Sequence, residues 1–180
     1  MTAARALFAE RGYAAVSADE IVSAAGLTRG ALHHHFGDKA GLFRAVLEQL
    51  DAELTAEVAQ AVADVPDTAG QMVVALRVFL DLCQRPEVVR ISLTDAPSVL
   101  GWGTWREIEA EHALGLIKNM IENGVAAGMI IPQPVEVLAQ LVLSVTIEAA
   151  LMVVHAKDPA TTRQAVEPAL ITMLSGLLRS

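Results

Sequence analysis

The sequence has few of the features that mark several common classes of protein. It holds a single cysteine, Cys83, among 180 residues, so no internal disulfide can form, and this sparing use of thiols is typical of a reducing compartment. Aromatic residues make up only 4% of the chain, and no stretch alternates apolar and polar residues as a half-buried strand does. No signal-like segment opens the chain. These absences predict an all-α, cytoplasmic protein.

The sequence also lacks the spaced motifs of common enzyme sites. It contains no nucleophile elbow, no phosphate-binding loop and no metal-ligand spacing, and Cys83 has no sequence neighbour suited to activate it. The run His33, His34 and His35 does not form a metal site, because consecutive helical residues point about 100° apart and cannot converge on one ion. We therefore expect no enzyme activity, no catalytic residue, no metal and no cofactor.

Charge is unevenly distributed along the chain. The formal net charge is −8. Residues 1–50 carry five Lys or Arg and five Asp or Glu, so they are neutral, and the rest of the chain supplies the whole excess of acid. Residues 51–180, here called the body, would repel nucleic acid because they are acidic. Residues 1–50, here called the head, are neutral and can approach it. Any DNA binding should therefore be selective and salt-dependent, unlike that of a general packaging protein.

Local rules predict two short helices joined by a tight turn between residues 17 and 36. Ser17 and Glu20 have the spacing of a capping box, so a helix should begin at about Ala18. Gly26 suits the left-handed residue that ends this helix, and Thr28 is a good N-cap for the next. The residues expected to face inward from the first helix and the turn are Ile21, Val22, Ala25 and Leu27.

The second of these helices should run from Thr28 to Phe36, where Gly37 and Asp38 end it and cap the next. Leu32 and Phe36 lie four residues apart and therefore share the buried side. Arg29, Gly30, His33 and His34 are left facing solvent or a partner. So short a helix needs a shared core, for which the candidates are Leu7, Phe8, Leu42, Phe43 and Val46. This layout is that of a helix-turn-helix that places one helix in the DNA major groove.

These residues resemble the DNA-binding domain of the TetR family of bacterial transcriptional regulators. The resemblance rests on FAERGY, on AAGLTRGAL, on the pair His35 and Phe36, and on the helix start at Lys39. His33 stands where the family usually has tyrosine. The resemblance implies an all-α protein with a three-helix helix-turn-helix domain over residues 1–47. A long helix would join it to a helical effector-binding and dimerisation domain over residues 48–180.

Seven residues are the predicted DNA contacts. Arg29 is the candidate for reading a base edge, because a guanidinium can pair with guanine. Lys39 is expected to hold a phosphate, although a plain solvated charge is the alternative, and Thr28 either holds a phosphate or serves only as an N-cap. The full set is Thr28, Arg29, Gly30, His33, His34, His35 and Lys39.

The rest of the chain is predicted to be helical apart from DAPSVLGWG, which is rich in turn formers. The expected helices are 38–65, 68–84, 86–93, 104–128, 134–157 and 159–178. The helix over 134–157 is nearly long and apolar enough to span a membrane, but Gln140 and Glu148 favour burial in a protein assembly. With 53% apolar residues, the chain has a surplus that suggests a subunit interface. The family resemblance implies a homodimer formed by the last two helices.

An effector pocket is expected among polar and aromatic side chains on these apolar helices. Its candidate residues are Phe79, Trp102, Trp105, His112, Met120, Glu148 and Met152. Trp102, expected in a loop, and His112 are the stronger candidates, because Met and Phe at helical spacing usually belong to a plain core. Glu109 is expected on the solvated surface.

The hypothesis that combines these features is a repressor that releases double-stranded operator DNA when a small, largely apolar molecule binds the body. Such a ligand acts through its difference in affinity for two arrangements of the dimer. The alternatives are an activator without small-molecule induction and a helical dimeric protein-interaction module.

Overall fold

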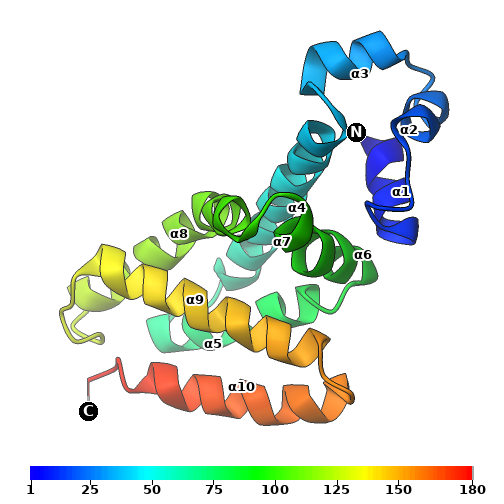
Figure 1. Cartoon of the computed structure of the whole chain (residues 1–180). Coiled ribbons are helices and arrows are strands. Elements are labelled where there is room, and N and C mark those ends of the chain that lie inside the picture. The colour runs from blue at the N-terminus through cyan, green and yellow to red at the C-terminus, as the bar shows by residue number, and fades with distance from the viewer. Residues whose placement is uncertain (180) are drawn as a thin grey trace. The chain divides into compact units, whose positions relative to one another are not determined.

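The structure, a computed structural model that describes residues 1–179, is built from helices (Figure 1). Among these residues no strand occurs, and the only β-type pairing is an isolated bridge between Ile130 and Leu178. The predicted all-α fold is confirmed. The chain divides into two compact units, one of residues 1–53 with 84–109 and the other of residues 54–83 with the chain from 110 onward.

Unit 1 holds the predicted head together with a segment distant in sequence. Its elements are α1 (Thr2–Arg11), α2 (Ala18–Ala24), α3 (Arg29–Phe36), the first part of α4 (Lys39–Val62), α6 (Pro86–Val88), the π-helix η1 (Val89–Asp95), α7 (Ala96–Val99) and the start of α8 (Trp102–Ala126). Helix α1 packs against α2, α6 and η1. The prediction of functional domains over 1–47 and 48–180 stays a prediction. The division into compact units differs from it, because residues 84–109 belong to the same unit as the head.

The stretch DAPSVLGWG is more regular than its composition predicts. Residues Ala96–Val99 are helical, and Trp102 is the first residue of α8, so the expectation of an irregular loop was wrong. Pro97 lies in the first turn of α7, where a missing N–H costs no hydrogen bond. Only Gly101, with φ of 82°, breaks the helical path. The remaining predicted helices are present, with ends displaced by a few residues.

An aromatic cluster forms the centre of unit 1. Phe8 and Phe43 are fully buried, and their rings meet edge to face with centroids 5.2 Å apart. Tyr13 completes the cluster, 5.8 Å from Phe8 and 5.1 Å from Phe43. Such pairs add stability beyond their buried area. The predicted core positions Leu42 and Val46 are buried as well, so α1 and α4 share the core that the short helices need.

Residues 84–109 are bonded to the head. The Arg5 guanidinium donates to Glu87 at 3.0 and 2.9 Å and to Glu53 at 2.5 Å. The backbone N–H of Tyr13 donates to Asp95 Oδ2 at 2.7 Å. Both acceptors on the distant segment are charged, and hydrogen bonds of this kind are stronger than neutral ones. Helices α6 and η1 are therefore integral to unit 1.

Unit 2 contains α5 (Thr68–Leu82), the remainder of α4 and α8, and the last two helices, α9 (Val135–Val154) and α10 (Pro159–Ser175). Helix α9 packs along α10, and both contact α5. Arg163 on α10 donates to Asp81 on α5 at 2.7 Å, and Arg77 on α5 donates to Glu167 on α10 at 2.7 Å. Paired charges on neighbouring helices thus fix the register of α5 and α10.

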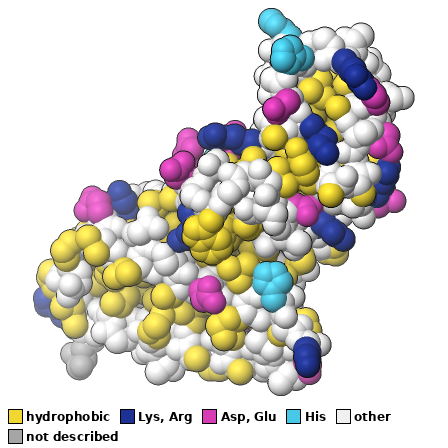
Figure 2. Space-filling model, in the orientation of Figure 1, with side chains coloured by type: hydrophobic (Ala, Val, Ile, Leu, Met, Phe, Trp, Pro, Cys, Tyr) yellow, Lys and Arg dark blue, Asp and Glu magenta, His cyan; other side chains and the backbone are white. Residues whose placement is uncertain are grey.

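Several large apolar side chains on α9 and α10 are exposed in the single chain. They are Val137, Leu141, Met152 and Met173, and apolar side chains are visible among polar ones on this part of the surface (Figure 2). By length and composition α9 qualifies as a membrane span, but 39% of its most apolar window is buried inside the fold. An exposed apolar face of this kind is also typical of a subunit interface.

Candidate nucleic-acid interface

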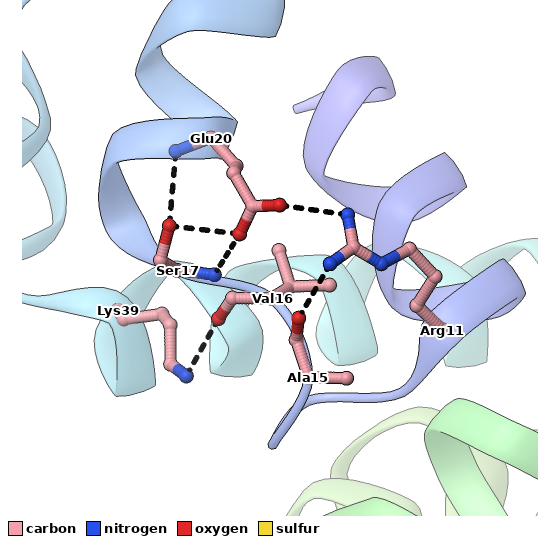
Figure 3. Close-up of polar contacts among 6 residues, drawn as sticks. All are labelled: Arg11, Ala15, Val16, Ser17, Glu20 and Lys39. Atoms are coloured by element: carbon pink, nitrogen blue, oxygen red, sulfur yellow. Dashed lines mark hydrogen bonds and ion pairs between the residues drawn. The ribbon is translucent and has the colours of Figure 1, made fainter.

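The capping box predicted from sequence begins α2. The Ser17 hydroxyl accepts the Glu20 N–H at 3.2 Å, and Glu20 accepts the Ser17 N–H at 2.8 Å (Figure 3). The other carboxylate oxygen of Glu20 accepts from Arg11, which also donates to the Ala15 carbonyl. Hydrogen bonds from the Ser17 backbone and from Arg11 lower the pKa of Glu20 to about 2. Glu20 therefore joins the end of α1 to the start of α2 as a carboxylate throughout the physiological range.

The turn between α2 and α3 is as predicted at its backbone but not at its side chains. Gly26 has φ of 64°, in the left-handed region that favours glycine. Ile21 and Val22 are buried, but Leu27 is 53% exposed and Ala25 is exposed, so the expectation that both face inward was wrong. Helix α2 ends at Ala24, and helical spacing does not set the direction of residues in a turn.

Helix α3 has one buried and one open side. Leu32 is buried and Phe36 is half-buried, so these two residues fix α3 on the small core. Thr28 caps the helix by accepting the Ala31 N–H at 3.2 Å, which leaves its hydroxyl proton available as a donor. The open side carries exposed Arg29, Gly30, His33, His34 and His35. Histidine side chains gather at this end of unit 1 (Figure 2).

Gly30 leaves space on that open side. The nearest atom that an added Cβ would meet is the Thr28 hydroxyl oxygen, 3.8 Å away. Glycine is therefore not needed here for packing within the chain. The missing side chain instead lets a partner approach the α3 backbone closely.

Two charged groups of the interface are paired within the head. The Nε and Nη2 groups of Arg29 donate to the two carboxylate oxygens of Asp19 on α2. These hydrogen bonds, together with the opposite charges, lower the pKa of Asp19 and raise that of Arg29. Both side chains remain exposed, at 73% for Arg29 and 60% for Asp19. Sequence reasoning missed Asp19 because the pair joins residues ten positions apart on different helices.

His33 is oriented by the end of its own helix. Its Nδ1 lies in hydrogen-bonding contact with the Gly37 carbonyl. A carbonyl can only accept, so Nδ1 carries the proton and Nε2 is the nitrogen available to a further partner. The neighbouring rings of His34 and His35 meet edge to face, with centroids 5.1 Å apart.

Lys39 at the start of α4 holds the turn between α1 and α2. Its ammonium group donates to the carbonyl oxygens of Tyr13 at 3.0 Å and Val16 at 2.9 Å, the second of which Figure 3 shows. The nitrogen also lies 3.9 Å from the centre of the Tyr13 ring, a cation–π contact. The alternative of a plain solvated charge was therefore wrong. These hydrogen bonds use two of the three ammonium protons, which leaves one N–H for a further acceptor.

The candidate pocket residues do not all belong to one unit: two lie in unit 1 and five in unit 2. In unit 1, Trp105 is fully buried while Trp102 is 60% exposed, and their rings pack edge to face with centroids 4.9 Å apart. In unit 2, His112 has a buried Nε2 with no hydrogen-bond partner among the described residues. The others in unit 2 divide by exposure, with Phe79 and Met120 half-buried and Glu148 and Met152 exposed.

Glu109, expected on the surface, is buried. It is 8% exposed and accepts hydrogen bonds from Ser92 at 3.0 Å and from the Trp105 indole at 3.1 Å. Asp51 on α4 is also buried, and its Oδ2 has no hydrogen-bond partner among the described residues. Burial raises the pKa of both carboxyl groups, and for Asp51 the negative charge of Glu109 raises it further. The burial of Asp51 could have been predicted from the sequence, since Asp51 lies four residues after Leu47, on the apolar side of α4.

A capped short helix, a glycine turn and a second helix with one open face form a helix-turn-helix, the architecture of a class of DNA-binding proteins. Residues 1–46 match the family described as bacterial regulatory proteins, tetR family, and residues 69–177 match the tetracyclin repressor-like C-terminal domain. The chain belongs to the TetR family, as the motifs of its head predicted. This is a family of DNA-binding transcriptional regulators rather than of enzymes.

Individual relatives agree with this assignment. A crystal structure of a TetR-family transcriptional regulator from Pectobacterium atrosepticum is 34% identical and superposes with a TM-score of 0.87, covering 99% of this chain and 92% of that one. The transposon Tn10 TetC protein of Escherichia coli is 28% identical over 127 residues, which are 68% of this chain and 62% of TetC. The repressor AcnR of Corynebacterium efficiens is 33% identical over 105 residues, 54% of this chain and 55% of AcnR. The chain thus spans less than two-thirds of these two curated relatives.

Proposed function

We propose that this chain is a homodimeric, operator-binding repressor of transcription in the cytoplasm. The observation that carries the proposal is the division of α3 into a buried side and an open side. Leu32 is buried, whereas Arg29 and the three histidines that follow are exposed. A helix with these properties, mounted on a rigid three-helix core, suits insertion into a major groove.

Each predicted contact has a role in this proposal. Arg29 reads a guanine, while Gly30 permits close approach of the α3 backbone to the DNA. The groups assigned to phosphates are Thr28, His35 and Lys39, because each keeps at least one hydrogen-bond donor for an acceptor oxygen, and His33, which can donate from Nε2 when both of its ring nitrogens carry a proton. His34, exposed on the same helix, is a further candidate contact.

Dimerisation supplies the second recognition helix. The exposed apolar side chains of α9 and α10, among them Leu141 and Met173, support the family-implied pairing of these two helices with their copies. A dimer can place two α3 helices in successive major grooves about 34–36 Å apart, so the operator should contain two half-sites. Burial of the α9 face in a dimer also accounts for its hydropathy without a membrane.

Control by a small, largely apolar molecule is the remaining part of the proposal. Of the expected pocket groups, those that lie together in unit 2 are Phe79, His112, Met120, Glu148 and Met152. A structural neighbour, RolR, was solved in complex with resorcinol, and it is 20% identical with a TM-score of 0.76 over 96% of this chain and 83% of that one. Repression is favoured because several relatives are named repressors, among them AcnR. Activation is the alternative, since FasR of Mycolicibacterium smegmatis is named an activator.

Selection of duplexes from random-sequence DNA by the full chain tests the proposal. Recovered duplexes should share two half-sites, and gel shifts on them should show that Arg29→Ala loses about 1–3 kcal/mol of binding and relaxes preference at one base pair. Lys39→Met should weaken binding to selected and random duplexes alike. Failure to recover any preferred sequence would favour the protein-interaction module. A reporter placed behind the selected site distinguishes repression from activation.

A further inference from the structure

Asp19 is an acidic residue at the proposed DNA-binding surface, where a negative charge opposes binding. It lies in the first turn of α2 and is 60% exposed. Its two carboxylate oxygens accept from Nε and Nη2 of Arg29, the first residue of α3. A carboxylate near phosphates lowers DNA affinity through repulsion, so its pairing with the proposed base-reading residue calls for a reason.

The geometry of the pair leaves the recognition edge of Arg29 free. A guanidinium has five N–H groups, one on Nε and two on each of Nη1 and Nη2. Asp19 occupies the side edge, which is formed by Nε–H and one Nη2–H. The end edge, formed by Nη1–H and the other Nη2–H, keeps the two parallel donors that match O6 and N7 of guanine. The carboxylate and a guanine can therefore bind the same guanidinium at once.

The pair also fixes the direction of a long side chain. Two parallel hydrogen bonds define the plane of the guanidinium as well as its position. An arginine without such support loses rotamer freedom when it binds, which weakens the contact. The negative charge of Asp19 further offsets the unfavourable placement of a cation at the N-terminus of α3. A surface ion pair contributes little to folding, so its value here lies in orientation.

We propose that Asp19 is a positioning residue for DNA readout, holding the side edge of Arg29 so that its end edge is presented to a guanine. This inference rests on the proposed function, because it requires α3 to enter a major groove. Asp19 then improves discrimination by orienting the reading group for the correct base. Its charge weakens binding to every sequence alike and does not itself change the ratio of affinities.

The experiment compares Asp19→Asn with wild type on two probes, a duplex selected from random-sequence DNA and an unrelated duplex of equal length. Asparagine keeps the size of the side chain but loses its charge and one acceptor oxygen. The discrimination ratio is the dissociation constant for the unrelated duplex divided by that for the selected duplex. We expect this ratio to fall about tenfold, since a bidentate base contact discriminates by that order. Binding to the unrelated duplex should tighten about threefold through the lost repulsion. Glu10→Gln, an exposed acid on α1, is the control for charge and should leave the ratio unchanged.

A double variant separates positioning from a general structural role. With Arg29→Ala already present, Asp19→Asn should no longer change the ratio, because the group it positions is gone. Replacing the critical guanine by 7-deazaguanine, which lacks the N7 acceptor, should likewise remove the difference between wild type and Asp19→Asn. Thermal melting checks that every variant is folded.

The outcomes distinguish this inference from the proposed function. If wild type discriminates and Arg29→Ala reduces the ratio, but Asp19→Asn leaves it unchanged, only the positioning role is overturned. An equal fall in the presence and absence of Arg29 would overturn it as well, since the effect would not pass through Arg29. If wild type prefers no duplex, the proposed function and this inference fall together.

Discussion

Asp51 and Glu109 are two carboxyl groups buried within unit 1. Glu109 receives hydrogen bonds from Ser92 and Trp105, while Asp51 Oδ2 has no partner among the described residues. Two buried negative charges repel each other and lose solvation, so the folded state favours a bound proton. The charged groups acting on the pair are Glu48, which raises the pKa of Asp51, and Arg106, which lowers that of Glu109.

The sign of the resulting pH dependence follows from the raised pKa values. A group whose pKa is higher in the folded than in the unfolded chain contributes stability below the unfolded value. That stability is lost as pH rises through the folded value. The contribution of these two carboxyl groups to stability should therefore fall as pH increases above about 4, where unfolded carboxyl groups ionise.

Asp51→Asn should remove most of this loss. The amide is neutral at every pH, so we expect it to stabilise the protein at pH 8 by about 1–3 kcal/mol relative to wild type. At pH 4 the two proteins should unfold at similar denaturant concentrations. Chemical denaturation across this range measures both, and parallel pH profiles for the two proteins would contradict the assignment.

The turn between α1 and α2 depends on a side chain from another element. Lys39 on α4 donates to the carbonyls of Tyr13 and Val16, so α4 fixes the entry to the helix-turn-helix. Lys39→Met keeps the alkyl chain near the Tyr13 ring but removes both hydrogen bonds. We expect a loss of about 1–3 kcal/mol in stability and faster amide exchange across residues 12–17.

Arg44→Met is the matched control for that substitution. Arg44 is an exposed cation on the same helix that pairs with Glu48 within α4, so its loss should leave exchange in the turn unchanged. Equal exchange in Lys39→Met and wild type would show that Lys39 does not hold the turn.

Features of single elements were predictable from sequence where they depend on neighbours a few residues away. The Ser17 and Glu20 capping box, the Thr28 cap and the left-handed Gly26 are of this kind. The burial of Glu109 was not, because it depends on Ser92, seventeen residues earlier, and on the way η1 packs. The pairing of Arg29 with Asp19 likewise requires two helices to be placed in space before it can be seen.

At the scale of the whole molecule, the apolar composition points to association. The exposed Leu141 on α9 and Met173 on α10 are residues that a dimer of the proposed kind would bury. Leu141→Glu should place a charge in that interface and convert a dimer to monomer, because an unpaired buried charge costs several kcal/mol. Sedimentation or light scattering at micromolar concentration measures the mass.

Leu27→Glu is the matched control for association. Leu27 is 53% and Leu141 is 58% exposed in the single chain, but Leu27 belongs to the helix-turn-helix, away from the last two helices in sequence. It should leave the mass of the assembly unchanged. A monomeric wild-type protein, or a dimer unaffected by Leu141→Glu, would rule out the proposed pairing of α9 and α10.

The Arg5 bridge to Glu53 and Glu87 sets a practical boundary for engineering. A graft of residues 1–47 onto a foreign regulatory body would transfer the arginine and leave both of its acceptors behind. A chimera that also carries residues 48–53 and 84–109 would preserve them. Exchange of DNA specificity between such regulators should therefore succeed more often when the chimera includes α6 and η1 together with the head.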